Sequence, residues 1–341
     1  MTARRDRDRY CSGLLARLAY RAAEHRGIDA TALLKSAGLS LEVIQDRSAR
    51  VEVSKQVEFV NLMATAFDDP LFGFHLTKDL DLRELGWLYY VAASADTLGT
   101  ALQRLERYCR IQNEAVRLKV SNGTRVSTII SYSQVARHSD FHQIGGFIAA
   151  ILALTRHIAA SWRSPTEVSI AHRIGEQTRT LGLFLNAAIH DGAGVDEICL
   201  PAESWKAPVV RADPFLHDLC IKACEDALAA TRETTTEIRI EVENAVAELL
   251  PHGQATQSEV AKHMGMSQRT LARRLAEEGS SFSELLSNVR RALAGRYLMN
   301  PSLSISEIAW LLGYSEVSTF TRAFQRWTGA SPSATRAAAR G

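Results

Sequence analysis

The sequence contains few cysteines, and they do not form the pattern of a disulfide framework. Five cysteines are scattered along 341 residues, an odd number with no repeated spacing: Cys11, Cys109, Cys199, Cys220 and Cys224. This distribution agrees with a reducing compartment. Only the last two lie one helical turn apart, and a small buried apolar side chain is the more frequent role of such a cysteine than redox or metal chemistry.

Long apolar runs are also absent. The longest candidate, Ile144–Leu154, is shorter than the about 18 residues that a membrane helix needs and is followed by Arg156 and His157. The opening MTARRDRDRY carries arginines without the apolar stretch of a signal peptide. We therefore expect a cytoplasmic protein with no membrane segment.

The common catalytic motifs are missing too. No phosphate-binding G-x-x-x-x-G-K-[ST], zinc-protease H-E-x-x-H or hydrolase G-x-S-x-G occurs. His138 and His142 have a spacing that suits a metal on a helix, but no acidic residue or cysteine is adjacent, so ordinary polar or core histidines are favoured. Trp87, Tyr89 and Tyr90 could line an effector pocket, although such aromatics are more often core. We expect no enzymatic activity, no cofactor and no metal.

The length and the charge distribution predict two domains of different character. Single cores rarely exceed roughly 250–300 residues, so 341 residues suggest two. From Thr256 onward, eleven basic residues stand against six acidic ones, a net charge of +5, whereas the preceding part has 29 basic and 32 acidic residues, or −3. A basic excess confined to the end of the chain indicates an anionic partner for that end.

That basic end contains one pattern written twice. TQSEVAKHMGMSQRTLARRLAEEG begins at Thr256, and SISEIAWLLGYSEVSTFTRAFQRWTG begins at Ser304. Glutamate, alanine, glycine and serine recur at an offset of about 48 positions, which becomes about 49 after the turn because the second turn has one extra residue. Each copy reads as a helix, a glycine-containing turn and a second helix. A duplicated helix-turn-helix points to DNA.

Local signals fix where these helices begin and end. Capping boxes are predicted at Thr256 with Glu259, at Ser281 with Glu284 and at Ser304 with Glu307, each a hydroxyl and a carboxylate that exchange bonds with backbone amides. Gly265 and Gly313 stand where the first helices must stop. Ser267 and Ser315 are then placed to cap the second helices. Apolar residues at helical spacing predict the inward faces: Val260, Met264, Leu271, Leu275, Ile305, Ile308, Leu312, Phe320, Phe324 and Trp327.

The outward residues of the second helices are the candidates for reading bases, because that helix lies in the major groove. In the two units these are Gln268, Arg269, Thr270, Ala272 and Arg273, and then Ser318, Thr319 and Arg322. Arginine can pair with guanine through two bonds, worth about 1–3 kcal/mol of discrimination. Other basic residues suit phosphates, which hold register without reading sequence: Lys262, Arg290, Arg291, Arg296 and Arg326.

A helix over Phe282–Met299 joins the two units. At 1.5 Å per residue it is roughly 27 Å long, which brings two recognition helices near the ~34 Å separation of successive major-groove faces. One chain could therefore read two groove segments without a dimer. An acidic helix, Glu237–Leu250, precedes the units, and its acidic face is expected to point away from DNA.

The preceding part reads as a mixed α+β domain of residues 1–230. Helices are predicted near Leu14–Gly27, Ala30–Ala37, Lys55–Phe67, Leu98–Gln112, Phe141–Ser161 and Phe215–Ala230. Alternating residues on either side of Asn122–Gly123 predict a hairpin, and Val168–Ala171 and Ile198–Leu200 are short strand candidates. The polar stretch 231–236, TRETTT, is the expected linker, followed by an all-α domain of residues 237–341.

At its basic end the chain resembles the DNA-binding domain of the AraC/XylS transcription regulators. The matching stretches are MGMSQRTLARRLAEEGSSF, RRALAGRYLMNPSLSISEIAWLLGYSEVSTFTRAFQRWTGASP and Arg336. One residue departs from that family: Val317 stands where many members carry a polar residue, often glutamine. The resemblance implies double-stranded DNA as a partner, and a thymine-methyl contact would suit Val317.

The front domain resembles, more loosely, the effector domain of the subgroup that includes ornithine-utilisation regulators. The best stretch is GWLYYVAASADTLGTALQRLERYCRIQNEAVRL from Gly86, whereas the subgroup's later FG-x-PV-x-F motif is replaced by GLFLNAAIHDGAGVD. The resemblance implies a small-molecule-sensing or dimerising domain and names no ligand. We expect an effector-responsive activator that contacts RNA polymerase, with a homodimer as a further expectation.

A second function class has a DNA-binding module of the same kind fused to an enzyme. Proteins of the adaptive response to alkylation damage take methyl groups from DNA on cysteines of a zinc site and of a Pro-Cys-His-Arg sequence. This chain contains neither Pro-Cys-His-Arg nor a four-cysteine cluster. The transcription regulator is therefore favoured over the methyl-transfer protein.

Overall fold

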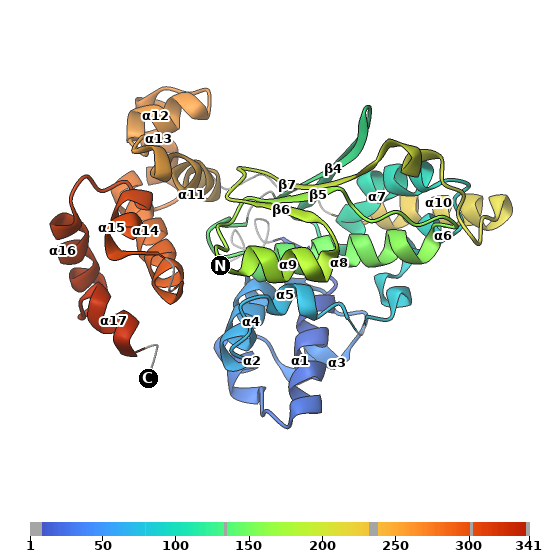
Figure 1. The fold of residues 1–341 in the computed structure, drawn as a ribbon, viewed down its shortest axis with the longest axis horizontal. Helices are drawn as coiled ribbons and strands as arrows, with labels where there is room; N and C mark the ends of the chain where they lie inside the picture. The colour runs from blue at the N-terminus through green and yellow to red at the C-terminus, as the bar shows by residue number, and fades with distance from the viewer. Residues whose placement is uncertain (1–8, 79, 133–134, 232–237, 301–302, 339–341) are drawn as a thin grey trace. The chain divides into compact units, whose positions relative to one another are not determined.

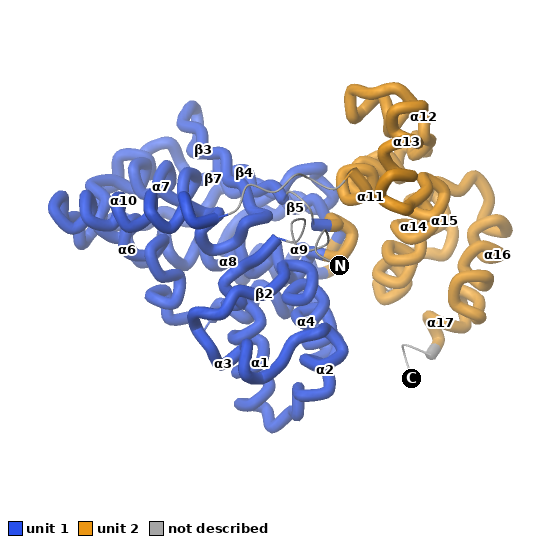
Figure 2. Tube along the Cα trace, turned by 180° about the vertical axis from the view of Figure 1, so that it is seen from behind, with its two compact units in different colours: residues 1–135, 140–173, 177–235 blue, residues 136–139, 174–176, 236–341 orange. Residues whose placement is uncertain are grey.

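The computed structural model describes residues 9–78, 80–132, 135–231, 238–300 and 303–338. Backbone contacts divide the chain into two compact units (Figure 2). Unit 1 comprises residues 1–135, 140–173 and 177–235, and unit 2 comprises residues 136–139, 174–176 and 236–341. The predicted linker, apart from Thr231, lies outside the described residues, and the predicted domain limits stay a prediction.

Unit 1 combines helices with a small sheet (Figure 1). Its α-helices are α1 (Leu14–Arg26), α2 (Thr31–Ser36), α3 (Leu41–Gln45), α4 (Val53–Ala66), α5 (Phe72–His75), α6 (Trp87–Ala93), α7 (Leu98–Gln112), α8 (Phe141–Ile158), α9 (Gln177–Leu185) and α10 (Pro214–Ala229). Short 3-10 turns occupy Leu82–Leu85 and Ala202–Lys206. Within the described residues no helix is both long and apolar enough to span a bilayer.

The sheet of unit 1 has five strands in the order β3-β4-β7-β5-β6. They are β3 (Val116–Asn122), β4 (Arg125–Tyr132), β5 (Glu167–Ile170), β6 (Ala188–Asp191) and β7 (Asp196–Pro201). All neighbours are antiparallel except β5 and β6, which pair in parallel across α9. A separate two-stranded sheet joins β1 (Tyr10–Cys11) to β2 (Val51–Glu52). The predicted hairpin is confirmed, with Asn122 opposite Val126 next to the turn.

The core of unit 1 explains where its helices lie. Leucines, alanines and Phe59 on α1 to α4 form one buried cluster. The central helix α8 is buried along most of its length, and two of its glycines accommodate neighbours: a Cβ on Gly145 would lie 2.7 Å from the Phe74 ring, and one on Gly146 would lie 2.8 Å from Leu15. Close helix packing therefore requires glycine at these two positions.

Unit 2 is all helical in the described residues. Its elements are α11 (Ile238–Leu249), a 3-10 turn (Leu250–His252), α12 (Gln257–His263), α13 (Gln268–Glu277), α14 (Phe282–Met299), α15 (Ile305–Leu311), α16 (Val317–Thr328) and α17 (Pro332–Ala338). One apolar cluster runs through them, and it contains the predicted inward residues of both repeats, fully or partly buried. The predicted fold class, α+β followed by an all-α domain with two helix-turn-helix units, is confirmed.

Candidate nucleic-acid interface

The first helix-turn-helix unit consists of α12 and α13. The Thr256 hydroxyl caps α12 by accepting a bond from the Glu259 amide at 3.2 Å. Gly265 adopts φ +67°, which lets the chain leave α12 without Cβ strain. The Ser267 hydroxyl then caps α13, accepting from the Thr270 amide at 3.1 Å. The turn therefore forms as the sequence predicted.

The second unit consists of α15 and α16. Ser304 and Glu307 form the complete capping box: the Glu307 amide donates to the serine hydroxyl at 3.1 Å, and the Ser304 amide donates to the carboxylate at 2.7 Å. The bond from the Ser304 amide to the carboxylate lowers the pKa of Glu307. Gly313 turns the chain with φ +70°.

One predicted cap is wrong, and two of the three predicted capping boxes form only in part. Ser315 does not cap α16, because the helix begins one residue later and Glu316 occupies the cap position without a side-chain cap bond. The extra residue in the second turn moves the helix start away from the serine. At Thr256 and Ser281 the hydroxyl half of the box forms, but of these three boxes, all within the described residues, only the one at Ser304 has both reciprocal bonds.

The outward face of α13 carries the predicted base-reading residues. Gln268, Arg269, Ala272 and Arg273 are exposed, while Leu271 and Leu275 are buried against the core. Thr270 is half-buried, and its hydroxyl lies 2.9 Å from that of Ser267 in the cap. Arg273 forms an ion pair with Glu277 one turn away, which holds its guanidinium along the exposed face.

The outward face of α16 is less basic. Ser318, Thr319 and Arg322 are exposed, while Phe320 and Phe324 are buried. The Ser318 hydroxyl donates to the Glu316 carboxylate at 3.1 Å. Val317 is 37% exposed beside them. Among the described residues, no hydrogen bond or ion pair engages the guanidinium of Arg322, so it is available to a ligand.

The five predicted phosphate contacts fall into two groups. Lys262, Arg291 and Arg326 are exposed. Arg290 and Arg296 are half-buried, and the Arg296 guanidinium lies 5.7 Å from the centre of the Tyr297 ring. The base and phosphate assignments of all thirteen residues stay predictions.

Arg290 has a structural role that the sequence did not reveal. Its Nε donates to the Leu312 carbonyl at 2.9 Å and its Nη2 to the Gly313 carbonyl at 3.3 Å. The guanidinium also lies 4.4 Å from the centre of the Tyr314 ring. A side chain on the connecting helix α14 thus fixes the turn of the second unit. In the sequence, Arg290 and Arg291 are two adjacent basic residues in the middle of α14, and nothing in that pattern distinguishes Arg290 as the support of the turn.

A comparable contact anchors the first unit. The Glu278 carboxylate, just after α13, accepts bonds from the amides of Ile238 and Arg239, each at 3.2 Å. These amides belong to the first turn of α11, which has no intrahelical acceptor for them. The end of one recognition helix therefore caps the start of α11. Arg336 supports the other end of unit 2 by donating to the Leu298 carbonyl at 3.3 Å.

The other candidate residues of unit 1 have ordinary roles. His142 accepts a bond from the Gly73 amide at 3.4 Å, and the described residues contain no group of three or more histidines, cysteines or acids placed to hold a metal. All five cysteines are buried and unpaired. Tyr89 is buried, whereas Trp87 and Tyr90 are exposed. None of these three aromatics is among the described residues that line the apolar cavity around Leu14 and Leu154, whereas Leu88 is.

Comparison with known proteins places both parts of the chain. Residues 27–209 match the family described as the arabinose-binding domain of AraC transcription regulators, and residues 260–338 match a helix-turn-helix domain family. The chain belongs to the AraC family of transcription regulators. It is a DNA-binding transcription regulator, and the resemblance inferred from its repeats is confirmed.

Curated relatives extend over almost the whole chain. The transcriptional regulator VirS of Mycobacterium tuberculosis is 28% identical over 91% of this chain and 92% of its own length. The ornithine utilization regulator of Pseudomonas aeruginosa is 25% identical over 90% of each chain. RipA of Corynebacterium glutamicum is 43% identical over 26% of this chain and 28% of its own length. VirS and RipA are named as helix-turn-helix-type transcriptional regulators, in agreement with the matched helix-turn-helix family.

Proposed function

We propose that this AraC-family regulator reads two successive major-groove segments of one DNA site with α13 and α16. The observation that carries the proposal is the pair of exposed faces, each backed by a buried apolar face and each following a left-handed glycine. The connecting helix α14 has 18 residues, or about 27 Å, which suits two faces of one duplex.

The experiment is selection of bound sequences from random duplexes by the full chain and by two variants. Arg273→Ala and Arg322→Ala are each expected to relax base preference, in different halves of the site, by about 1–3 kcal/mol at the affected base pair. Arg291→Ala is the control, expected to weaken binding on all sequences alike and to reduce the salt slope by about 1. If both arginine variants behaved like the control, neither residue would read bases.

We assign more of the base-specific affinity to the first unit, because α13 presents Arg269, Arg273 and Arg274 whereas α16 presents Arg322 in its centre. The second unit is the better candidate for contact with RNA polymerase. Trp310 on α15 is 63% exposed at the position that corresponds to Lys262 in the first unit. Trp310→Ala is expected to reduce activated transcription while leaving DNA affinity unchanged.

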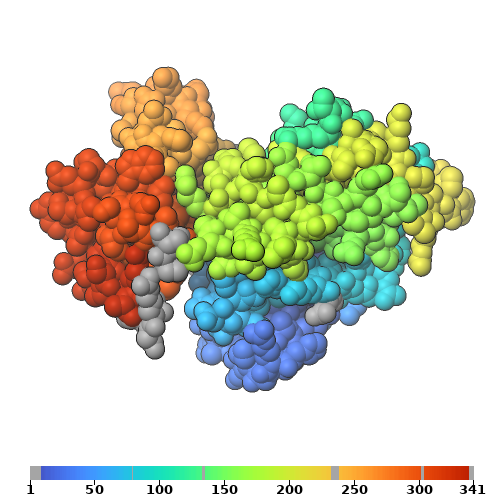
Figure 3. All heavy atoms as spheres, in the orientation of Figure 1, coloured from blue at the N-terminus to red at the C-terminus, as the bar shows by residue number. Residues whose placement is uncertain are grey.

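The homodimer is proposed to form through α10. Phe215 and Leu219 lie one turn apart on this helix and are 75% and 51% exposed. Figure 3 shows this yellow end of unit 1 at the surface. Asp218 and Lys222 flank the apolar stripe, so two copies related by a two-fold axis can pair opposite charges. Phe215→Glu is expected to convert the dimer to a monomer in light scattering, and an unchanged mass would place the dimer elsewhere.

The chain is proposed to act without enzymatic chemistry, in the cytoplasm where bacterial DNA lies, and as an effector-responsive activator. Burial raises the pKa of both Cys11 and Cys109 to about 11, so these thiols stay neutral and are poor methyl acceptors. An assay with labelled alkylated DNA tests the methyl-transfer alternative. Transfer of label to the protein would overturn the proposal that this regulator has no enzymatic activity. The matched family's name refers to arabinose and one relative's name to ornithine, which makes a small-molecule effector the natural input.

A further inference from the structure

Unit 1 contains an apolar cavity whose lining comes mainly from α1, α6, α7, α8 and β3. Leu14, Leu88, Leu105, Phe147 and Leu154 are among its lining residues. None of the described residues that line it is a lysine, arginine, histidine, aspartate or glutamate. Its volume is about 70 Å³, several times the roughly 10–15 Å³ that one water molecule requires. The space therefore suits a slender apolar molecule.

Two amide donors in the lining have no acceptor among the described residues. Asn113 is 1% exposed, and its Oδ1 accepts a bond from the Ala115 amide at 2.9 Å, which fixes the orientation of the side chain. Its Nδ2 is then left without a partner, as is Nε2 of the adjacent Gln112. A buried donor without an acceptor lowers the stability of the fold by about 1–3 kcal/mol. Two such donors in one cavity therefore indicate that a bound molecule supplies the missing acceptor.

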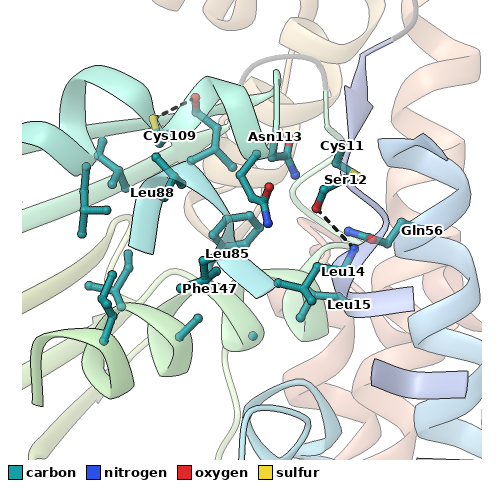
Figure 4. A pocket seen from close by; sticks show the side chains of 18 residues that line it. Cys11, Ser12, Leu14, Leu15, Gln56, Leu85, Leu88, Cys109, Asn113 and Phe147 are labelled. Atoms are coloured by element: carbon teal, nitrogen blue, oxygen red, sulfur yellow. Dashed lines mark hydrogen bonds between the residues drawn. The ribbon is translucent and has the colours of Figure 1, made fainter. Parts of the chain in front are cut away.

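The other polar groups of the lining are already engaged. Gln56 Oε1 accepts from the Ala16 amide at 3.4 Å, and its Nε2 donates to Gln143 at 3.1 Å. The Ser12 hydroxyl accepts from the Leu14 amide at 3.4 Å. Figure 4 shows Ser12, Gln56 and Asn113 toward one side of the cavity, with Leu88 on the other. The cavity thus has a polar side that offers donors and an opposite apolar side.

This lining rejects strongly polar molecules. A sugar would bury several hydroxyls against leucines, and each unpaired hydroxyl is costly. An amino acid or a carboxylate would bury charge with no opposite charge in the lining. The thiols of Cys11 and Cys109 are neutral and add to the apolar surface.

We propose that the effector of this regulator is a neutral, slender apolar molecule with one oxygen acceptor, such as a ketone, aldehyde, ester or amide. Its oxygen accepts bonds from Asn113 Nδ2 and Gln112 Nε2, and its hydrocarbon part lies among the leucines. This inference rests on the proposed function in that the occupant is taken to be the effector.

The experiment measures binding of 2-butanone, 2-hexanone and 2-octanone to the full chain by calorimetry and by the shift in Tm. n-Hexane, hexanoate, xylose and lysine are the comparison compounds. Ketones are expected to bind and to raise Tm, with affinity changing along the series, whereas xylose, lysine and hexanoate leave Tm unchanged. Two results would overturn the proposal. One is binding of xylose or lysine at this cavity. The other is no ketone binding at a ketone concentration about tenfold above that needed to saturate a site with a millimolar Kd.

Two variants separate recognition from structure. Gln112→Met keeps the shape and removes the donor, so the affinity for 2-hexanone should fall about tenfold while the affinity for n-hexane is kept. The ligand-free Tm should not fall, because an unpartnered donor has been removed. A fall in Tm with unchanged ketone affinity would mean that the amide serves a bound water instead, and the assignment would be wrong.

Ala150→Leu fills the cavity from α8, since Ala150 is part of the lining. It should abolish ketone binding, and Ala153→Leu, on the same helix but outside the lining, should not. If ketones bind but DNA affinity and transcription do not change, the cavity is a binding site and the proposed effector role is wrong. DNA binding without any ketone binding would overturn the ligand inference alone and leave the proposed function standing.

Discussion

The two helix-turn-helix units share a backbone pattern but differ in how each is held in place. The first is tied to α11 by the Glu278 carboxylate, which accepts from the Ile238 and Arg239 amides. The second is tied to α14 by Arg290, which donates to carbonyls of the turn. A duplicated motif can therefore keep its cores and glycines while its supports diverge, and the supports are where equivalent substitutions should have unequal effects.

The largest effects on stability are expected in the cores of the two units. Phe320 occupies the position of Leu271, and its ring lies 5.8 Å from both the Tyr314 and the Phe324 ring centres. Phe320→Ala should lower the free energy of unfolding by about 4 kcal/mol and Leu271→Ala by about 3 kcal/mol. Chemical denaturation of the full chain measures both, and hydrogen exchange locates the loss in α15–α16 or α12–α13. A cost below about 1 kcal/mol at either position would contradict its place in the core.

The next comparison concerns neighbours on α14. Arg290→Met removes two bonds to carbonyls and the contact with Tyr314, so unfolding should become easier by about 2 kcal/mol. Arg291→Met, at an exposed position, should stay within about 0.5 kcal/mol of the parent. The measurement is again chemical denaturation. Equal stabilities of the two variants would show that Arg290 does not support the turn.

The two turn glycines sharpen the comparison further. Both have a positive φ, so replacing either with alanine should cost about 1 kcal/mol of left-handed strain. At Gly313 a Cβ would also lie 3.1 Å from the Leu250 carbonyl oxygen, whereas at Gly265 it would meet nothing within 4 Å. Gly313→Ala should therefore lower Tm more than Gly265→Ala. A larger loss of Tm for Gly265→Ala would mean that the backbone at Leu250 moves away from the new Cβ at little cost.

The smallest effects are expected at the caps. Ser267→Ala should cost about 1 kcal/mol, because it removes the bond from the Thr270 amide. Ser315→Ala should change the free energy of unfolding by only a few tenths of a kcal/mol, since Glu316 holds the cap position of α16. Thermal unfolding of both variants distinguishes them. If Ser315→Ala lost as much stability as Ser267→Ala, Ser315 would be the cap of α16 after all.

Much of unit 2 could be predicted because its signals are local. A cap such as Ser267 and a glycine such as Gly265 act within one turn of the chain, so their residues suffice to place a boundary. Ser315 was misassigned because one inserted residue shifts the helix start, and the identity of the residues does not reveal that shift. The roles of Arg290 and Glu278 could not be predicted, since each depends on which distant carbonyl or amide passes nearby.

Unit 1 was predictable to a lesser extent for the same reason. Helix α7 has the predicted limits, and the hairpin follows its Asn122–Gly123 turn. The parallel pairing of β5 with β6, by contrast, depends on where α9 returns the chain. The cavity draws its lining from residues between Cys11 and Leu154, so neither its apolar character nor the unpartnered amide of Asn113 is visible from any one segment.

The two different units, joined in a fixed order by α14, have one further consequence, which concerns orientation. A dimer of identical readers places the same surface at both ends of a palindrome, and the complex looks alike from either direction. One chain that carries α13 and α16 in a fixed order has two different ends. Its site on DNA would then be directional, and inverting that site would turn a different face of the protein toward the promoter.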